Sequence, residues 1–214
     1  MRPEAILFDW DNTLVDTWSA IHEALNATLV AFGHAPWTLD ETRDRVRKSM
    51  RDSFPALFGD AWRDAGETFY RHLDAVHLDT LAPRPGARRM LDELSDAGFY
   101  LGVVSNKKGE VLRVEAAHLG WERYFAKIVG AFDAARDKPA PDPVDMALFG
   151  SGIERGDKVW FAGDTDVDLA CAFNSGCVGV LVRRKPPAET EFGATRPTWH
   201  FPDCLTLSKT ARNL

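Results

Sequence analysis

Short apolar segments rich in β-branched residues recur along the chain and predict the buried strands of a sheet. They cover residues 6–8, 100–104, 127–131, 159–162 and 178–182. Strands that are apolar on both sides are typical of a parallel sheet with helices on both faces. One more short strand is expected near Trp199, after a loop that begins at Arg183.

Helical periodicity occupies the intervals between these strands from residue 86 onward. Apolar residues repeat every three or four positions from Ala87 to Ala97 and from Leu112 to Leu119, and a glycine follows each repeat. Glycine at that place is a common helix end. Because strands and helices alternate, the pattern predicts parallel βα units. We therefore expect an α/β core with a doubly wound parallel sheet, formed by residues 1–15 and 83–214.

Residues 16–82 show a different pattern, with helical stripes and no convincing strand. The apolar positions of the two stripes are Trp18, Ile21, Leu25, Leu29 and Phe32, then Trp62, Ala65, Phe69, Leu73 and Val76. This pattern predicts a small all-helical cap domain inserted after the first strand. Its hinges would be Asp16–Thr17 and the proline-rich return segment 81–86.

Composition narrows the class of protein. The 214 residues are 45% hydrophobic, enough for one domain with an insertion, and the net charge of −6 argues against a nucleic-acid binder. No apolar stretch reaches the roughly 18 residues of a membrane span, and no signal-peptide pattern opens the chain. Its 3 cysteines include no CxxC pair, so neither zinc nor a disulfide framework is indicated. We expect a cytoplasmic monomer or homodimer, without nucleic-acid or membrane partners.

Polar residues come directly after the first strand in the order Asp9–Trp10–Asp11–Asn12–Thr13. Alternation along an extended chain points residues i and i+2 the same way, so Asp9 and Asp11 can converge just beyond the sheet. Taken alone, the pentad is more typical of a turn or a helix cap. Its meaning depends on the residues that stand at the ends of the other strands.

The other predicted strands also end in residues that suit phosphate and metal chemistry. Ser105, Asn106 and Lys107 come after the second strand, Lys138 after the third, and the segment 163–168, with Asp164 and Asp168, after the fourth. Each group alone is compatible with a helix cap or a surface position. Parallel strands, however, bring their carboxyl ends to one edge, where ligands bind. Two acids, a hydroxyl, a cation and a second acidic pair at one edge indicate an enzyme site.

In content and chain order these motifs resemble the haloacid dehalogenase superfamily. The pentad Asp9–Thr13 matches DxDx[TV], Ser105 and Lys138 match the second and third motifs, and Asp164 with Asp168 matches the acidic fourth motif. The resemblance covers nearly the whole chain, and residues 16–82 stand where the superfamily carries its helical C1 cap. The chain looks most similar to the phosphoglycolate phosphatase-like branch. A Rossmann-like α/β core with this cap is the fold that the resemblance implies.

The resemblance also implies a magnesium-dependent phosphatase of a small phosphorylated metabolite. Asp9 would be the nucleophile that forms an aspartyl-phosphate, and Asp11 the acid and base. Ser105 and Lys138 complete the implied catalytic set. Mg²⁺ would be held by Asp9, Asp11, Asp164 and Asp168, with Asp11 offering its backbone carbonyl and Asp168 either binding the ion or supporting the site. The implied phosphate-binding residues are Trp10, Asp11, Ser105, Asn106 and Lys138.

Substrate selection is expected from the cap, where Lys48 and Arg51 are the candidate contacts to a second anionic group. Arg47 stands where related phosphatases often have glycine. Dehalogenases lack the second aspartate of the first motif, which is present here as Asp11. Three alternatives stay open: a phosphonatase, for which Lys48 is the nearest Schiff-base candidate, a phosphosugar mutase, and a non-catalytic module that binds a phosphorylated ligand.

Overall fold

The computed structural model describes residues 2–214, and its centre is a six-stranded parallel sheet. The strand order is β5–β4–β1–β6–β7–β8, with every pairing parallel. The strands are β1 (Ala5–Phe8), β4 (Tyr100–Lys108), β5 (Lys127–Ala131), β6 (Val159–Gly163), β7 (Val178–Val182) and β8 (Trp199–Phe201). The predicted doubly wound α/β fold is confirmed, and β1 lies between β4 and β6.

Helices cover both faces of this sheet, as the two-sided apolar strands predicted. Along β1, Ile6 and Phe8 pack into one apolar cluster, and Ala5 and Leu7 pack into another on the opposite face. The first cluster contains residues of α5 (Ala87–Asp96), α6 (Gly109–His118) and α9 (Cys204–Asn213). The second contains residues of α7 (Asp142–Leu148) and α8 (Asp166–Asn174).

The final helix, α9, was not predicted from the sequence. Asp203 caps it by accepting a hydrogen bond from the Thr206 backbone N–H at 2.8 Å. Its buried stripe consists only of Cys204, Leu207, Ser208 and Ala211, which is too short and too mixed to stand out as a periodic pattern. The buried stripe of α9 packs against α5.

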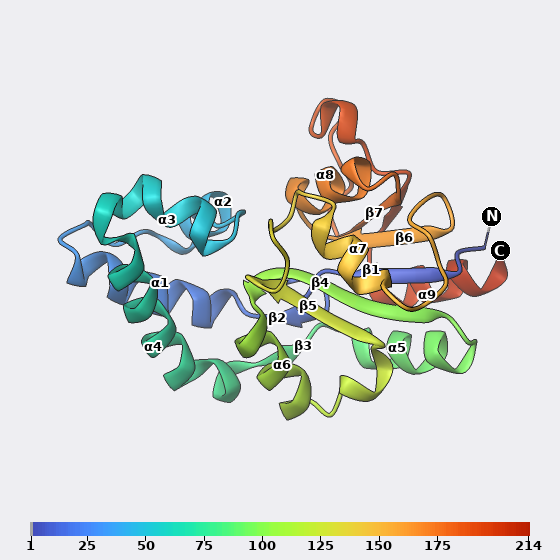
Figure 1. Cartoon of the computed structure of the whole chain (residues 1–214), viewed down its shortest axis with the longest axis horizontal. Coiled ribbons are helices and arrows are strands. Elements are labelled where there is room, and N and C mark those ends of the chain that lie inside the picture. The colour runs from blue at the N-terminus through green and yellow to red at the C-terminus, as the bar shows by residue number, and fades with distance from the viewer. Residues whose placement is uncertain (1) are drawn as a thin grey trace.

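Helices α1 (Trp18–Ala31), α2 (Leu39–Arg45), α3 (Met50–Phe58) and α4 (Trp62–Thr80) form the cap, a separate group beside the sheet (Figure 1). The cap has its own apolar cluster, which includes Leu29, Phe54 and Phe58. A two-stranded antiparallel ribbon, β2 (Val15–Asp16) and β3 (Ala82–Pro83), joins the chain segments that enter and leave it. The domain boundaries 16–82 and 83–214 stay a prediction.

Three short 3₁₀ helices complete the described elements: η1 (Gly59–Ala61), η2 (Glu122–Tyr124) and η3 (Gly193–Thr195). Both chain ends lie at the end of the molecule away from the cap (Figure 1). Within residues 2–214, no helix combines the length and the apolar composition that a membrane crossing requires. All 3 cysteines are buried as free thiols.

Candidate active site

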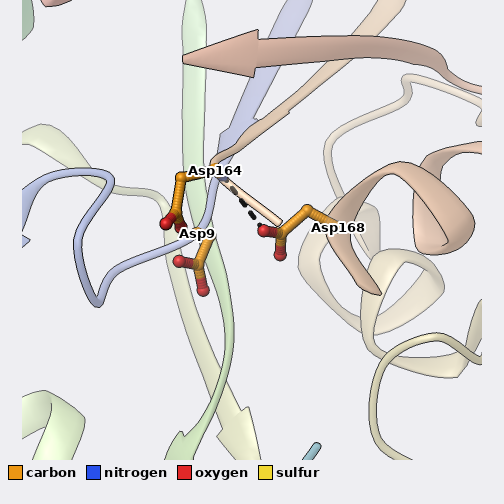
Figure 2. Close-up of side chains that lie close together, drawn as sticks. All are labelled: Asp9, Asp164 and Asp168. Atoms are coloured by element: carbon orange, nitrogen blue, oxygen red, sulfur yellow. Dashed lines mark hydrogen bonds between the residues drawn. The ribbon is translucent and has the colours of Figure 1, made fainter. Parts of the chain in front are cut away.

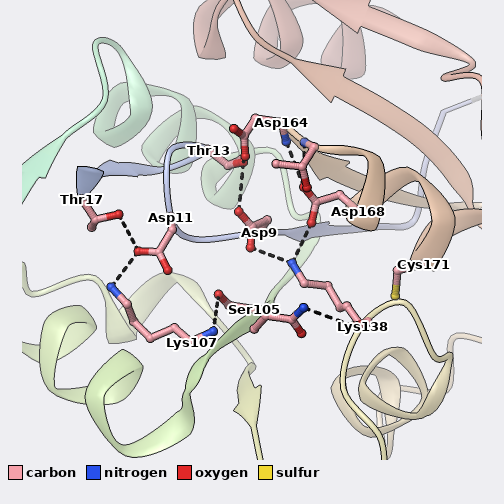
Figure 3. Close-up of polar contacts among 12 residues, drawn as sticks. Asp9, Asp11, Thr13, Thr17, Ser105, Lys107, Lys138, Asp164, Asp168 and Cys171 are labelled. Carbon is pink, nitrogen blue, oxygen red and sulfur yellow. Dashed lines mark hydrogen bonds and ion pairs between the residues drawn. The ribbon is translucent and has the colours of Figure 1, made fainter. Parts of the chain in front are cut away.

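Neighbouring strand ends bring the predicted residues together at the carboxyl edge of the sheet (Figure 3). Phe8 of β1 is in register with Val103 of β4 and with Ala162 of β6. Asp9 therefore emerges at the end of β6 and beside β4, next to the segment that carries Asp164. Lys138 reaches the same point from the connection between β5 and α7. The prediction that the second strand ends at residue 104 was wrong: β4 continues to Lys108, so Ser105, Asn106 and Lys107 lie within the strand, beyond the end of β1.

Three carboxylates form a compact acidic cluster there (Figure 2). Asp9, Asp164 and Asp168 each offer an oxygen, and these oxygens all lie within 4.8 Å of one another. Burial raises the pKa of Asp9 to about 7, although Lys138 acts in the opposite direction. Burial, together with the charges of Asp168 and Asp9, also raises the pKa of Asp164. Crowded, desolvated carboxylates of this kind favour a bound cation.

Lys138 connects the two buried acids of this cluster. Its Nζ donates to Asp9 Oδ1 and to Asp168 Oδ1, both at 2.7 Å. Burial disfavours the charged lysine, but Asp168 and Asp9 outweigh that cost, so the pKa of Lys138 lies above its ordinary value. The ammonium group therefore stays charged and holds the Asp9 carboxylate in one position.

Asp168 is held by the start of α8 as well as by Lys138. Its Oδ2 accepts hydrogen bonds from the Asp164 N–H at 3.1 Å, the Thr165 N–H at 3.0 Å and the Thr165 hydroxyl at 2.8 Å. A Cβ on Gly163 would lie 2.2 Å from Asp168 Cγ, so only glycine leaves room for this side chain. Both oxygens of Asp168 are thus engaged, and its Oδ1 orients Lys138.

Thr13 links Asp9 to Asp164, a role that the sequence did not reveal. Its hydroxyl lies 3.3 Å from Asp9 Oδ2 and 3.2 Å from Asp164 Oδ1. The two acids that would share a cation are therefore spaced by one hydroxyl group.

A second polar network surrounds Asp11. Asp11 Oδ1 accepts a hydrogen bond from the Thr17 hydroxyl at 2.7 Å and pairs with Lys107 Nζ at 2.7 Å. Lys107 Nζ also contacts both oxygens of Glu115 at 2.8 Å. Burial disfavours the charged Lys107, but Asp11 and Glu115 raise its pKa above the ordinary value. Asp11 is thus held by a buried cation of its own.

Glu115 completes this network from the interior of α6. It is fully buried and accepts hydrogen bonds from the Trp10 indole N–H at 2.7 Å and from His77 Nδ1 at 2.9 Å. Burial opposes its charge, but Lys107, His77 and Trp10 together keep the pKa of Glu115 below its ordinary value. His77 belongs to α4, so the network reaches the cap.

The remaining predicted phosphate-binding residues lie close by. Ser105 is buried at the edge of the cavity between the cap and the sheet, and its Oγ accepts the Lys107 N–H at 3.2 Å. Asn106 Nδ2 donates to the Lys138 carbonyl at 3.1 Å. The Trp10 side chain is buried against Trp121, 5.8 Å between ring centroids, so only its backbone is available to a phosphate.

The structure places the two candidate cap residues differently. Lys48 is exposed and lines the cavity. Arg51 does not line it: its Nε donates to Asp137 Oδ2 at 2.6 Å, and its Nη2 donates to Asp137 Oδ1 and to the Ala134 carbonyl. Arg51 therefore joins α3 to the core beside Lys138.

The cavity, of about 410 Å³, separates the cap from this edge of the sheet. Asp9, Asp11, Ser105, Lys138 and Asp164 line its floor, and side chains of the cap line its roof. Its volume is within the range of small-molecule sites. The arrangement can bind an anion beside Asp9 while enclosing the rest of a small ligand under the cap.

Clustered carboxylates at the carboxyl edge of a parallel sheet, covered by an inserted helical segment, stand where proteins with an α/β fold bind their ligands. The family model described as haloacid dehalogenase-like hydrolase matches residues 6–182. The chain belongs to this family, which confirms the resemblance seen in its motifs.

Curated relatives include phosphoglycolate phosphatases. The one from Xylella fastidiosa (strain 9a5c) is 32% identical over 178 residues, 81% of this chain and 77% of that protein. The one from Rhodobacter capsulatus is 28% identical over 198 residues, 86% and 88% of the two chains. The crystal structure of a HAD-superfamily hydrolase from Ehrlichia chaffeensis is 28% identical, with a TM-score of 0.68 over 100% of this chain and 98% of that one. A haloacid dehalogenase-like protein from Streptococcus pneumoniae, 21% identical with a TM-score of 0.84 over 97% and 98%, shares the fold.

Proposed function

We propose that this hydrolase cleaves a small-molecule phosphomonoester of the phosphoglycolate-like class, with Mg²⁺ and through an aspartyl-phosphate on Asp9. The observation that carries the proposal is the position of Asp9: it is buried, held by Lys138 at 2.7 Å, and within reach of the carboxylates of Asp164 and Asp168. A nucleophilic carboxylate needs this restraint and this neutralisation.

Asp9 would attack the phosphorus atom in line with the ester oxygen. A bond forms between an Asp9 oxygen and phosphorus, and the bond from phosphorus to the alcohol oxygen breaks. Lys138 and Ser105 would contact the phosphate oxygens, with the backbone of Trp10 and Asp11 and the side chain of Asn106. Positioning and charge neutralisation carry most of the rate in such transfers.

Asp11 would exchange the protons of both half-reactions. In the first, its carboxyl group protonates the departing alkoxide. In the second, its carboxylate takes a proton from water, the water oxygen attacks phosphorus, and the bond to Asp9 breaks to release phosphate. Thr17 and Lys107 both contact Asp11 Oδ1, which leaves Oδ2 for the proton transfer.

The residues present suit a magnesium ion, because their donors are oxygens and three carboxylates meet within 4.8 Å. Asp9, Asp164 and the backbone carbonyl of Asp11 would hold it, with Asp168 as a ligand or a support. Bound there, Mg²⁺ would neutralise charge on the phosphate and favour the ionised form of Asp9.

The other three functions have no specific support among residues 2–214. A Schiff-base lysine is typically desolvated, whereas Lys48 is exposed. No surface among residues 2–214 is recognisable as the sugar-binding site that a mutase needs. A non-catalytic binding module is expected to lack a catalytic group, whereas Asp9, Asp11, Lys138 and Asp164 are all present. A cytoplasmic location and a monomeric or homodimeric state stay predictions.

The decisive experiment is a phosphate-release screen over small phosphomonoesters with Mg²⁺, and it includes 2-phosphoglycolate because curated relatives bear that name. Asp9→Asn is the control. We expect release that this variant abolishes, and a hydroxylamine-labile phosphate label on the wild-type protein after rapid quenching. Release that Asp9→Asn leaves unchanged would rule out the proposed nucleophile.

A further inference from the structure

The cavity over Asp9 has two chemically different ends. Its floor, at the edge of the sheet, is polar and charged. Its roof is largely apolar: α1, α3 and α4 line it with Ile21, Leu25, Met50, Phe54, Leu57 and Phe69, and the segment 45–48 adds Arg45, Arg47 and Lys48. A substrate that fills the cavity must therefore place its phosphate on the floor and something else against the roof.

The apolar roof is more than the inner packing of the cap. Leu25 and Phe54 belong to the apolar cluster of the cap and also line the cavity, whereas Leu29 and Phe58, one turn further along the same helices, belong to the cluster alone. Protein interiors are close-packed, and an apolar cavity that stays empty costs stability. Because this cavity opens onto Asp9, the occupant that fits it is the alcohol part of the substrate.

Most positive charges around the cavity already have partners. Lys107 and Lys138 are held by buried carboxylates. Arg45 and Arg47 also line the cavity, and their partners lie at the surface: Arg45 pairs with Glu41 at 3.2 Å, and Arg47 lies 3.7 Å from Asp166.

Lys48 is exposed, and no ion pair joins it to another residue in the range 2–214. A carboxylate on the alcohol, such as that of glycolate, would exchange water for a wall of leucine, phenylalanine and methionine. That exchange is unfavourable unless a cation compensates, and Lys48 is the cation placed to do so.

We propose that the alcohol of the substrate carries an apolar chain or ring, which occupies the space between α1, α3 and α4. This inference rests on the proposed phosphomonoester hydrolysis but replaces its phosphoglycolate-like substrate class with esters of an apolar alcohol. Burial of apolar surface under the cap supplies the affinity and selectivity that the phosphate alone does not. The bonds that form and break are those of the proposed hydrolysis, and the product is an apolar alcohol.

The first test is phosphate release, with Mg²⁺, from straight-chain alkyl phosphates from methyl to hexyl. Beyond ethyl, the leaving alcohols are almost equally acidic, so changes in kcat/KM report burial of the chain. We expect kcat/KM to rise about fourfold for each added methylene until the cavity is filled. A flat series that still depends on Asp9 overturns this inference and leaves the proposed hydrolysis standing.

The second test compares isobutyl phosphate with 2-phosphoglycolate, because the two esters have nearly the same shape and differ in the charge of the alcohol. We expect kcat/KM for isobutyl phosphate to be at least about tenfold higher. Faster turnover of 2-phosphoglycolate overturns the apolar class, and its loss in Lys48→Met would identify the compensating cation. No release from any ester by folded, Mg²⁺-supplemented protein overturns the proposed function and this inference together.

A matched pair of variants locates the recognition in the roof. Leu57 and Leu78 are both half-buried leucines on cap helices, and only Leu57 lines the cavity. We expect Leu57→Lys to lower the ratio of hexyl phosphate to 2-phosphoglycolate turnover at least about tenfold, and Leu78→Lys to leave it unchanged. Equal effects of the two substitutions on this ratio overturn the assignment of the roof as the binding surface for the alcohol. If Leu57→Lys does not fold, the alkyl phosphate series on the wild-type protein decides.

Discussion

Two buried lysines flank the candidate site, one for each aspartate of the first motif. Lys138 pairs with Asp9 and Asp168, and Lys107 pairs with Asp11 and Glu115. In both cases the lysine is held by a second, buried acid, so its ammonium group has little freedom. The proposed nucleophile and the proposed acid–base residue are thus positioned by the same device.

The nucleophile half of the site (Asp9, Lys138 and Asp168) and the acid–base half (Asp11, Lys107 and Glu115) differ in the groups that hold the second acid. Asp168 is fixed by the backbone at the start of α8, within the core. Glu115 instead accepts a hydrogen bond from His77 of α4, a cap helix. The acid–base half is therefore tied to the cap through its second acid, whereas the cap meets the nucleophile half only through neighbouring residues, in the pairs Arg51–Asp137 and Arg47–Asp166.

The largest effect should result from breaking the nucleophile half. Lys138→Met removes the charge that positions Asp9 and that would contact the phosphate. We expect kcat/KM to fall by about 10³-fold or more, equally for butyl phosphate and for p-nitrophenyl phosphate, since both need the nucleophile. Steady-state kinetics on protein with an unchanged circular dichroism spectrum measures this, and a loss below about tenfold would contradict the role given to Lys138.

Breaking the acid–base half should give a smaller and more selective loss. Lys107→Met frees the Asp11 carboxylate to move, so we expect about a 10²-fold loss on butyl phosphate, whose alkoxide needs a proton. Turnover of p-nitrophenyl phosphate, which releases a stable anion, should change little. Lys108→Met is the control, because the neighbouring Lys108 forms its ion pair with the exposed Glu110 instead of with Asp11.

Lys107→Met leaves Glu115 buried without its cation, so a second variant is needed. The double variant Lys107→Met/Glu115→Gln keeps this part of the core neutral. Equal losses for both esters in this variant would mean that Lys107 only supports the fold.

The two lysines also show how much of the site can be predicted from the sequence and how much depends on tertiary structure. The strands, the cap helices and the motif with Lys138 are predictable from local periodicity and chain order. Lys107 lies two residues after Ser105 on an extended strand. Because side chains at i and i+2 point to the same face of a strand, the sequence could have indicated that Lys107 lies on the same face as Ser105. Lys107 pairs with Glu115, 8 residues further along the chain, and Glu115 in turn pairs with His77, 38 residues away, so this network forms only when the helices pack. The pairing of Arg51 with Asp137 is likewise a product of tertiary structure.

The pH dependence of stability should separate the halves in metal-free protein. The pKa of Asp9 is raised to about 7 from an ordinary 3.8, so the folded state binds a proton that the unfolded state has lost. The free energy of unfolding should then fall as pH rises from about 5 to 7, by up to about 1.4 kcal/mol per pH unit. The pKa of Glu115 is lowered, so the stability that its ionised form contributes is fully present throughout this pH window and adds no slope.

Urea unfolding in EDTA at several pH values measures this slope. Subtracting the free energy of unfolding of Asp9→Asn from that of the wild type removes the contribution of the histidines, which both proteins share. Adding Mg²⁺ should stabilise the protein more at pH 8 than at pH 5.5, because the ion binds the ionised carboxylates. Parallel curves for the wild type and Asp9→Asn would contradict the raised pKa of Asp9.

The smallest effect should come from cutting the tie between the acid–base half and the cap. His77→Ala leaves one hydrogen bond of buried Glu115 unmade, for which we expect a loss of about 1–3 kcal/mol in the free energy of unfolding. Exposed His72 lies on the same helix, and His72→Ala should cost less than about 0.5 kcal/mol. Because Lys107 still holds Asp11 in His77→Ala, the ratio of butyl to p-nitrophenyl phosphate turnover should change only slightly. If that ratio fell as far as in Lys107→Met, His77 would be part of the positioning of Asp11, and the cap would act on the chemistry as well as on stability.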